Sequence, residues 1–134
     1  MLEILGVFLL LALPAFFLSV GLDSKEMYKI WSDNFVELLE RLSSKNITVN
    51  YDIGNSAALG FDSDEELEAY GDRITDIHIK DRLLGGGPVF LGEGDADFDV
   101  FFEKLKEFNY QGIFIMQAYR DNEGIEIFKN QLNY

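Results

Sequence analysis

The sequence predicts an α/β fold with parallel strands, and two observations carry this prediction. From Ile47 onward, segments typical of strands and helices alternate in the order strand, helix, strand, helix, strand, helix. The connections between the strands suit right-handed crossovers, which parallel strands require. The composition fits one globular domain, since 48% of the 134 residues are hydrophobic and 26% are charged.

Charge and cysteine content exclude several classes of function. The formal net charge of −13 repels the phosphodiester backbone, so the sequence argues against nucleic-acid binding. The chain has no cysteine, which excludes disulfides, thiolate metal sites and a cysteine nucleophile. A metal would need nitrogen and oxygen ligands, and a small anionic substrate would need local cations to attract it.

Residues 1–22 form an apolar N-terminal segment in which positions 4–22 carry no charged side chain. A signal peptide is one interpretation, although Glu3 precedes the segment and no Lys or Arg does. A membrane span is the second, although Pro14 lies near its centre. The third, which we favour, is a buried helix followed by a buried strand at residues 15–20, with Pro14 between them.

Four helices are expected in residues 23–134. The first covers residues 23–44, the second follows a cap at Asp62 or Ser63 and reaches Tyr70, and the last lies near residues 125–132. A third helix follows a cap at Asp95 or Asp97. Apolar side chains at helical spacing mark the first and third helices: Met27, Ile30, Trp31, Phe35, Leu38, Leu39 and Leu42 in one, and Phe98, Phe101, Phe102 and Leu105 in the other.

Three strands are expected at residues 47–52, 74–79 and 113–117. The first is followed by residues 54–56, which we interpret as a polar loop. The second is followed by a glycine-rich loop at residues 83–94 that could close over a ligand.

Polar residues lie where these strands end, and parallel α/β folds bind ligands at the carboxyl ends of their strands. The candidates are Asp52 and Asn55 after the first strand, His78, Lys80, Asp81 and Arg82 after the second, and Gln117, Tyr119 and Arg120 after the third.

Asp52 and His78 together form half of a site for a divalent ion such as Mn²⁺, Mg²⁺ or Zn²⁺. Each also has a structural interpretation, because a lone histidine is often a hydrogen-bonded structural residue and an aspartate after a strand often caps a loop. Lys80, Arg82 and Arg120 could hold a phosphate, or could pair with Asp81 and Asp121.

Six short motifs follow one another along the chain: Tyr51-Asp52-Ile53-Gly54-Asn55, Gly71-Asp72-Arg73-Ile74, His78-Ile79-Lys80-Asp81-Arg82, Leu91-Gly92-Glu93-Gly94, Asp97-Phe98 and Tyr110-Gln111-Gly112. Taken in series, they resemble the C-terminal part of the xylose-isomerase-like TIM-barrel superfamily, in the branch of hexulose-6-phosphate isomerases and L-ribulose-5-phosphate 3-epimerases. The resemblance runs from about residue 47 to residue 119. It implies a partial (β/α)8 barrel of three to four βα units in residues 23–134.

The resemblance implies a metal-dependent enzyme that moves a proton between adjacent carbons of a ketose or aldose phosphate through an enediolate. The family holds its metal with a glutamate, an aspartate, a histidine and a second glutamate, and the glutamates act as acid and base. Asp52 matches the aspartate and His78 the histidine. Asn55, Lys80, Arg82 and Arg120 are the expected substrate-binding residues.

The sequence departs from the family pattern at both glutamates. Gln117 stands where the final strand usually has glutamate; an amide oxygen can ligate a metal, but the amide cannot act as a general base. No acidic residue lies in residues 15–22, and Asp23 follows that stretch. Gln117 therefore remains the only candidate at the catalytic position, and a catalytically silent sugar-phosphate binder is the alternative function.

A partial barrel leaves sheet edges unpaired. Three explanations are open: the chain pairs with a second copy, it associates with a separately encoded N-terminal half, or it is a truncated product. Cytoplasmic localisation is expected because the family's substrates are cytoplasmic, with a membrane-anchored remnant through residues 4–22 as the alternative.

Overall fold

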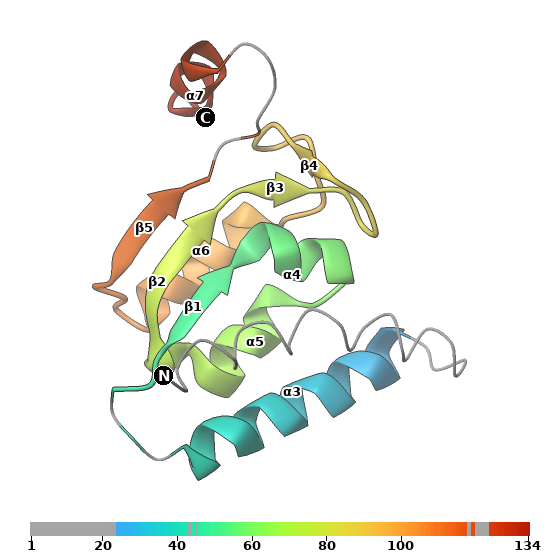
Figure 1. Cartoon of the computed structure of the whole chain (residues 1–134), viewed down its shortest axis with the longest axis vertical. Coiled ribbons are helices and arrows are strands. Elements are labelled where there is room, and N and C mark those ends of the chain that lie inside the picture. The colour runs from blue at the N-terminus through green and yellow to red at the C-terminus, as the bar shows by residue number, and fades with distance from the viewer. Residues whose placement is uncertain (1–23, 43, 45, 118, 120–123) are drawn as a thin grey trace, which may run out of the picture.

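The computed structural model describes residues 24–134 except residues 43, 45, 118 and 120–123 (Figure 1). The apolar segment at residues 1–22, for which a buried helix and strand are predicted, lies outside the described residues. None of the described helices is long and apolar enough to cross a bilayer. The elements in chain order are α3 (Ser24–Arg41), β1 (Val49–Asp52), α4 (Ile53–Leu59), α5 (Ser63–Tyr70), the 3-10 helix η1 (Gly71–Arg73), β2 (Ile74–Ile79), β3 (Asp81–Arg82), β4 (Pro88–Val89), α6 (Phe98–Glu107), β5 (Ile113–Met116) and α7 (Ile125–Gln131).

Three parallel strands form the main sheet in the order β1-β2-β5, which confirms the predicted α/β class. The register pairs Asp52 with His78 across β1 and β2, and Ile79 with Met116 across β2 and β5. The carboxyl ends of the three strands therefore meet at one edge of the sheet.

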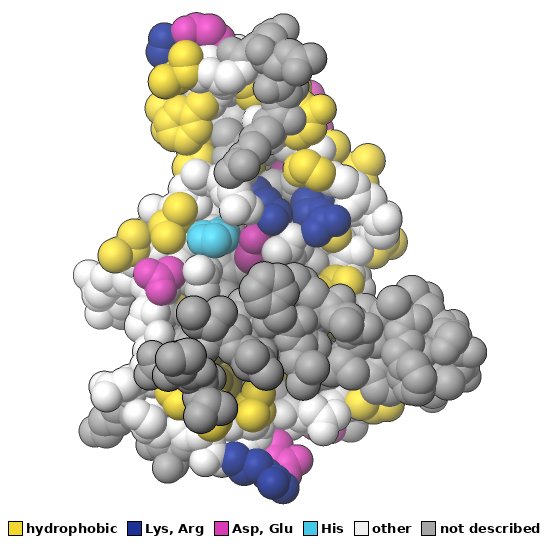
Figure 2. Space-filling view, viewed as in Figure 1, with side chains coloured by type: hydrophobic (Ala, Val, Ile, Leu, Met, Phe, Trp, Pro, Cys, Tyr) yellow, Lys and Arg dark blue, Asp and Glu magenta, His cyan; other side chains and the backbone are white. Residues whose placement is uncertain are grey.

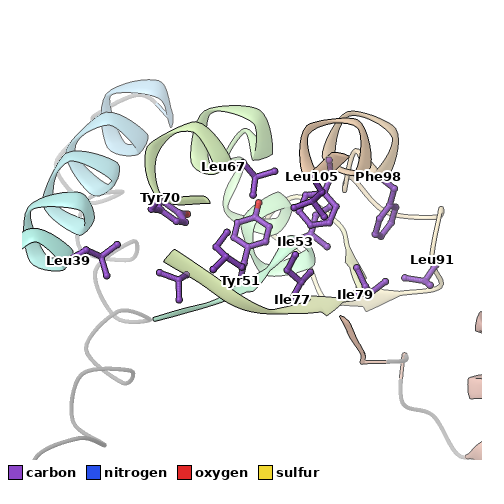
Figure 3. Close-up of a cluster of buried hydrophobic side chains, with 13 residues drawn as sticks. Leu39, Tyr51, Ile53, Leu67, Tyr70, Ile77, Ile79, Leu91, Phe98 and Leu105 are labelled. Atoms are coloured by element: carbon purple, nitrogen blue, oxygen red, sulfur yellow. The ribbon is translucent and has the colours of Figure 1, made fainter. Parts of the chain in front are cut away.

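Helices α3 to α6 lie on one side of this sheet, and the core lies between these helices and the strands (Figure 3). Alternation along β1 sends Val49 and Tyr51 into the core, so Asn50 and Asp52 project from the opposite face. In β2, Ile77 and Ile79 are buried, and His78 lies on the same face as Asp52. Asp52 and His78 thus lie side by side on the sheet face opposite the core.

Two segments predicted as loops contain regular structure. Residues 54–56 belong to α4, which starts directly after β1 because Asp52 caps it by accepting a hydrogen bond from the Asn55 N–H. The glycine-rich segment contains β4, which pairs antiparallel with β3. The predicted apolar face of α3 is only partly covered, since Leu39 is buried whereas Leu38 and Leu42 are exposed.

Strand β5 is apolar on both faces but poorly covered. Ile113, Phe114 and Ile115 are 63%, 49% and 40% exposed. β5 pairs with β2 along one edge, and no other strand of the described residues pairs with its second edge. This open edge is the feature expected of a partial barrel.

A buried carboxylate connects β1, α4 and α5. Glu66 is 4% exposed and accepts hydrogen bonds from the hydroxyls of Tyr51 (2.8 Å), Tyr70 (2.7 Å) and Ser56. Burial raises the pKa of Glu66 because the ionised form loses water, and the three hydroxyl donors only partly offset this effect. The network fixes the helix layer behind the strand that ends in Asp52.

A second buried carboxylate holds the glycine-rich loop. Asp81 is 1% exposed and accepts backbone N–H groups from Gly92 (3.0 Å), Gly94 (2.9 Å), Ala96 (3.1 Å) and Arg82 (2.8 Å). A side chain at position 94 would collide with the Asp81 carboxylate, so glycine is required there. The loop is therefore anchored at its far end to the residue that starts β3.

We expect Glu66→Gln to change how stability depends on pH. The raised pKa means that the folded chain binds the Glu66 proton more tightly than the unfolded chain does. This contribution is complete below the ordinary value of 4.5 and is lost as the pH rises through the raised pKa. Urea unfolding at about pH 5.5 and about pH 8 should therefore show the wild type losing stability relative to Glu66→Gln as pH rises. Glu65→Gln, an exposed change on the same helix, should keep the wild-type pH dependence, and equal dependence in all three proteins would contradict the argument.

Asp81→Ala should loosen the glycine-rich loop because four backbone N–H groups lose their acceptor. We expect the free energy of unfolding to fall by about 2–4 kcal/mol. Amide hydrogen exchange should accelerate at Gly92, Gly94 and Ala96. The matched control is Glu93→Ala, an exposed change in the same loop; a similar effect from both variants would show that Asp81 does not anchor the loop.

Candidate functional site

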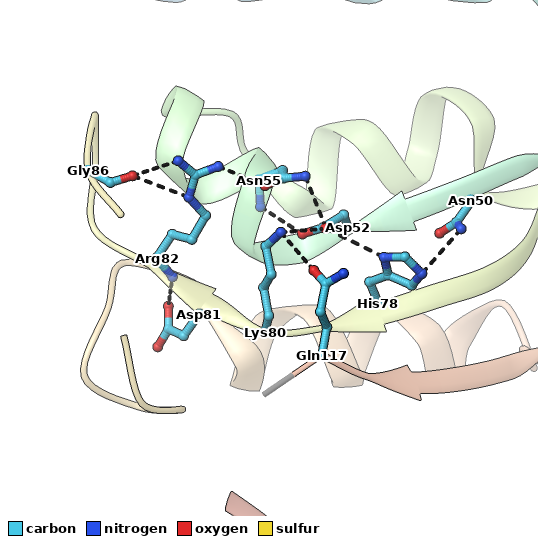
Figure 4. Close-up of polar contacts among 9 residues, drawn as sticks. All are labelled: Asn50, Asp52, Asn55, His78, Lys80, Asp81, Arg82, Gly86 and Gln117. Atoms are coloured by element: carbon cyan, nitrogen blue, oxygen red, sulfur yellow. Dashed lines mark hydrogen bonds and ion pairs between the residues drawn. The ribbon is translucent and has the colours of Figure 1, made fainter. Parts of the chain in front are cut away.

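Four predicted site residues meet at the carboxyl edge of the sheet (Figure 4). Asp52 ends β1, while His78 lies in β2 and Lys80 directly follows that strand. Gln117 follows β5 and donates its backbone N–H to the Ile79 carbonyl at 2.9 Å, which continues the pairing of the two strands. The parallel register thus brings together side chains that lie far apart in the sequence.

Asp52 is the centre of this cluster. Its Oδ1 accepts the Asn55 backbone N–H at 2.8 Å, and its Oδ2 accepts the Asn55 side-chain amide at 3.0 Å. The Lys80 ammonium also lies 3.0 Å from Oδ2, and His78 Nδ1 lies 3.6 Å from it. The structural interpretation of Asp52 as a capping carboxylate is therefore correct, and the same carboxylate also faces the candidate site.

His78 lies between two polar neighbours on the same face of the sheet. The Asn50 side-chain nitrogen is 3.3 Å from His78 Nε2, an arrangement in which the amide donates and the ring nitrogen accepts. The opposite ring nitrogen, Nδ1, faces the Asp52 carboxylate. Asn50 was not predicted as a site residue, although its position two residues before Asp52 on the same strand face is a signal that could have found it.

Lys80 is mostly buried and held from two sides. Its ammonium donates to Gln117 Oε1 at 2.9 Å and pairs with Asp52, and its side chain is 16% exposed. Gly54, in the first turn of α4, packs against the Lys80 stem. A Cβ at position 54 would lie 2.6 Å from Lys80 Cγ and 2.8 Å from the Lys80 carbonyl oxygen. Because position 54 has no side chain, the Lys80 side chain can extend past α4 to Asp52 and Gln117.

Arg82 connects the start of the glycine-rich loop with α4. Its guanidinium donates to Asn55 Oδ1 at 2.8 Å and to the Gly86 carbonyl at 2.7 and 3.2 Å. The predicted alternative was an ion pair between Arg82 and Asp81. Among the described contacts, the Asp81 carboxylate instead accepts backbone N–H groups. Arg120 and Asp121 lie outside the described residues.

The site opens to a hollow beside β1 with a volume of about 450 Å³, which is large enough for a small phosphorylated metabolite. Asn50, Asp52, Asn55 and His78 line its polar side, while Phe35, Tyr51, Leu59 and Phe61 contribute apolar walls. Figure 2 shows the histidine at the surface, with Lys, Arg and acidic side chains close to it. Lys80 and Arg82 thus place two cations around the single Asp52 carboxylate, in a chain with a net charge of −13.

The donor set does not fit a divalent cation as it stands. Within the described residues, no three His, Asp or Glu side chains lie close enough together to hold a metal ion. Asp52 and His78 could each supply one ligand and Gln117 an amide oxygen, but the Lys80 ammonium already binds the Asp52 and Gln117 oxygens. Their role as metal ligands stays a prediction.

Part of this chain is similar in sequence to curated proteins. A protein of Escherichia coli K12 provisionally named as an L-ribulose-5-phosphate 3-epimerase is 38% identical over 89 residues, which cover 61% of this chain and 31% of the relative. An L-ribulose-5-phosphate 3-epimerase of Salmonella paratyphi A is 36% identical over 74 residues, covering 52% of this chain and 25% of that protein. The chain thus spans about a third of the length of the relatives that it matches.

The fold agrees with these matches. The crystal structure of a xylose isomerase domain protein from Planctomyces limnophilus superposes with a TM-score of 0.64 over 76% of this chain and 39% of that one, at 24% identity. The family profile described as xylose isomerase-like TIM barrel matches residues 22–134. The parallel β1-β2-β5 sheet with its polar carboxyl edge is therefore part of such a barrel. The chain belongs to the xylose isomerase-like TIM barrel family, and relatives that it matches are named as L-ribulose-5-phosphate 3-epimerases.

Proposed function

We propose that this chain contributes the phosphosugar-binding part of an isomerase or epimerase site. The observation that carries the proposal is the pair of cations, Lys80 and Arg82, held at the carboxyl edge by Asp52 and Asn55. These two partners also line a hollow of about 450 Å³. Asp52 is the one acidic side chain that pairs with them among the described contacts. The site therefore keeps positive charge for an anionic ligand, although the whole chain is acidic.

The names of the relatives suggest a ligand class. Two of them are named for L-ribulose 5-phosphate, a ketose phosphate whose phosphate carries negative charge at one end and whose hydroxyls need polar partners at the other. Arg82 and Lys80 suit the phosphate, because guanidinium and ammonium groups form charge-assisted hydrogen bonds with it. Asn50, Asn55 and His78 suit the hydroxyls.

Proton transfer between adjacent carbons needs a base that faces the substrate. Asp52 is occupied by Asn55 and Lys80, and both ring nitrogens of His78 face polar neighbours. Gln117 lacks an ionisable group. We therefore propose that the acid and base of the reaction come from outside this cluster.

A catalytically silent sugar-phosphate binder is the second candidate, and Gln117 favours it. The resemblance places an acidic catalytic residue at this position, and here a neutral amide accepts a hydrogen bond from Lys80. This arrangement keeps the cation in place but supplies no proton acceptor.

The open edge of β5 supports the proposal that further strands complete the barrel, supplied by a second copy or by a separately encoded half. The exposure of Ile113, Phe114 and Ile115 gives an apolar surface for such a partner. Light scattering on the purified chain tests self-association: a discrete dimer that Phe114→Lys dissociates would support a second copy, and a stable monomer would contradict it.

We expect Lys80→Met and Arg82→Met each to weaken binding of L-ribulose 5-phosphate by about tenfold or more, because each removes a charge-assisted contact with the phosphate. Isothermal titration calorimetry checks this. Lys106→Met, an exposed change on α6, is the control and should leave the affinity unchanged. Absence of binding to the wild-type chain would overturn both candidate functions.

Exchange with solvent deuterium separates the two candidates. If the chain moves a proton at the carbon next to the carbonyl, incubation of the bound sugar phosphate in D₂O should replace that hydrogen, which proton NMR detects. Binding without exchange would support the silent binder and contradict independent isomerase or epimerase activity.

A further inference from the structure

We infer that the Lys80 ammonium serves as the built-in cation of this site and thereby keeps divalent metals out of it. This inference concerns which cation neutralises the Asp52 and Gln117 oxygens. It goes beyond the proposed sugar-phosphate ligand and does not depend on it.

The geometry places one cation between two oxygen donors from different strands. Lys80 Nζ lies 3.0 Å from Asp52 Oδ2 and 2.9 Å from Gln117 Oε1. These are the two oxygens at the edge that a divalent ion would need, with His78 Nδ1 as the nitrogen ligand beside Asp52 at 3.6 Å. An ion bound to all three atoms would have to displace the ammonium.

The charge balance favours the ammonium. Asp52 and Lys80 neutralise each other, and the Gln117 amide adds no charge. A divalent ion added to this cluster would leave two positive charges uncompensated, next to an ammonium only 16% exposed and therefore weakly screened by water. The second oxygen of Asp52 cannot offset this, because it accepts the Asn55 backbone N–H that begins α4.

The surroundings hold Lys80 in this position. Gly54 lies against its stem with no room for a Cβ, and the carbonyl oxygen of Lys80 packs against the same glycine. Moving the ammonium out to solvent would also leave Gln117 Oε1 without this donor. The cation is therefore fixed by packing as well as by charge.

Mn²⁺ alone is the probe, measured by calorimetry on the full chain without sugar. We expect weak binding to the wild type and at least about tenfold tighter binding to Lys80→Met, because the competing charge is removed. Lys80→Gln, which keeps a polar group in the cluster, should also gain affinity and serves if the methionine variant does not fold. The double variant Lys80→Met with Asp52→Asn should lose the gain, which locates the metal at this site, and Lys106→Met is the matched control.

Two results would overturn the inference. One is stoichiometric Mn²⁺ binding by the wild type at micromolar concentrations that Asp52→Asn abolishes, since the metal would then bind in spite of Lys80. The other is equally weak binding by the wild type and both Lys80 variants, since Lys80 would then not be what keeps the metal out. Because no sugar is present, failure here is distinct from failure of the proposed ligand.

Discussion

The carboxylate of Asp52 is the group on which the rest of the site depends. It ends β1 and caps α4, so it fixes where the strand stops and the helix starts. The same two oxygens hold the Asn55 amide and the Lys80 ammonium. The Asn55 side-chain oxygen in turn accepts a hydrogen bond from the Arg82 guanidinium. Two cations from the second βα unit are thus positioned by one acid at the end of the first.

Two buried carboxylates support this arrangement from behind. Glu66 fastens α5 to β1 and α4 through hydroxyl donors, and Asp81 fastens the glycine-rich loop through backbone N–H groups. A buried charge is tolerated when hydrogen bonds replace the water it loses. These supports leave Lys80 and Arg82 available to face the edge of the sheet.

The sequence predicted the strands well because their signals are local. Residues 74–79 alternate as a half-buried strand should, and the strand covers that same range. The start of α4 was missed because Gly54 and Asn55 are typical of turns, whereas tertiary packing decides here: Ile53 and Ala57 are buried, and Asp52 caps the helix. The β3–β4 pairing was also missed, because the many glycines of residues 83–94 are typical of an irregular loop. In the structure, the Asp81 carboxylate accepts backbone N–H groups of this loop, and β3 pairs with β4.

Residue types indicated which side chains gather at the edge, but the contacts between them could not be predicted. Lys80 was expected either to bind phosphate or to pair with Asp81, yet the register places Asp52 within its reach, and Asp81 turns toward the loop. Such a choice depends on strand register and on the space left by Gly54, neither of which a spacing pattern encodes.

The pairing of Lys80 with Gln117 connects these observations with the question of chemistry. Asp52 already pairs with Lys80, so a carboxylate at position 117 would add a negative charge to the cluster and weaken its attraction for an anion. The neutral amide accepts one ammonium hydrogen and adds no negative charge. A single change from acid to amide therefore favours anion binding while it removes a proton acceptor. In this part of the barrel, recognition of a phosphorylated ligand and catalysis on it are physically separable, because different atoms of the same cluster govern them.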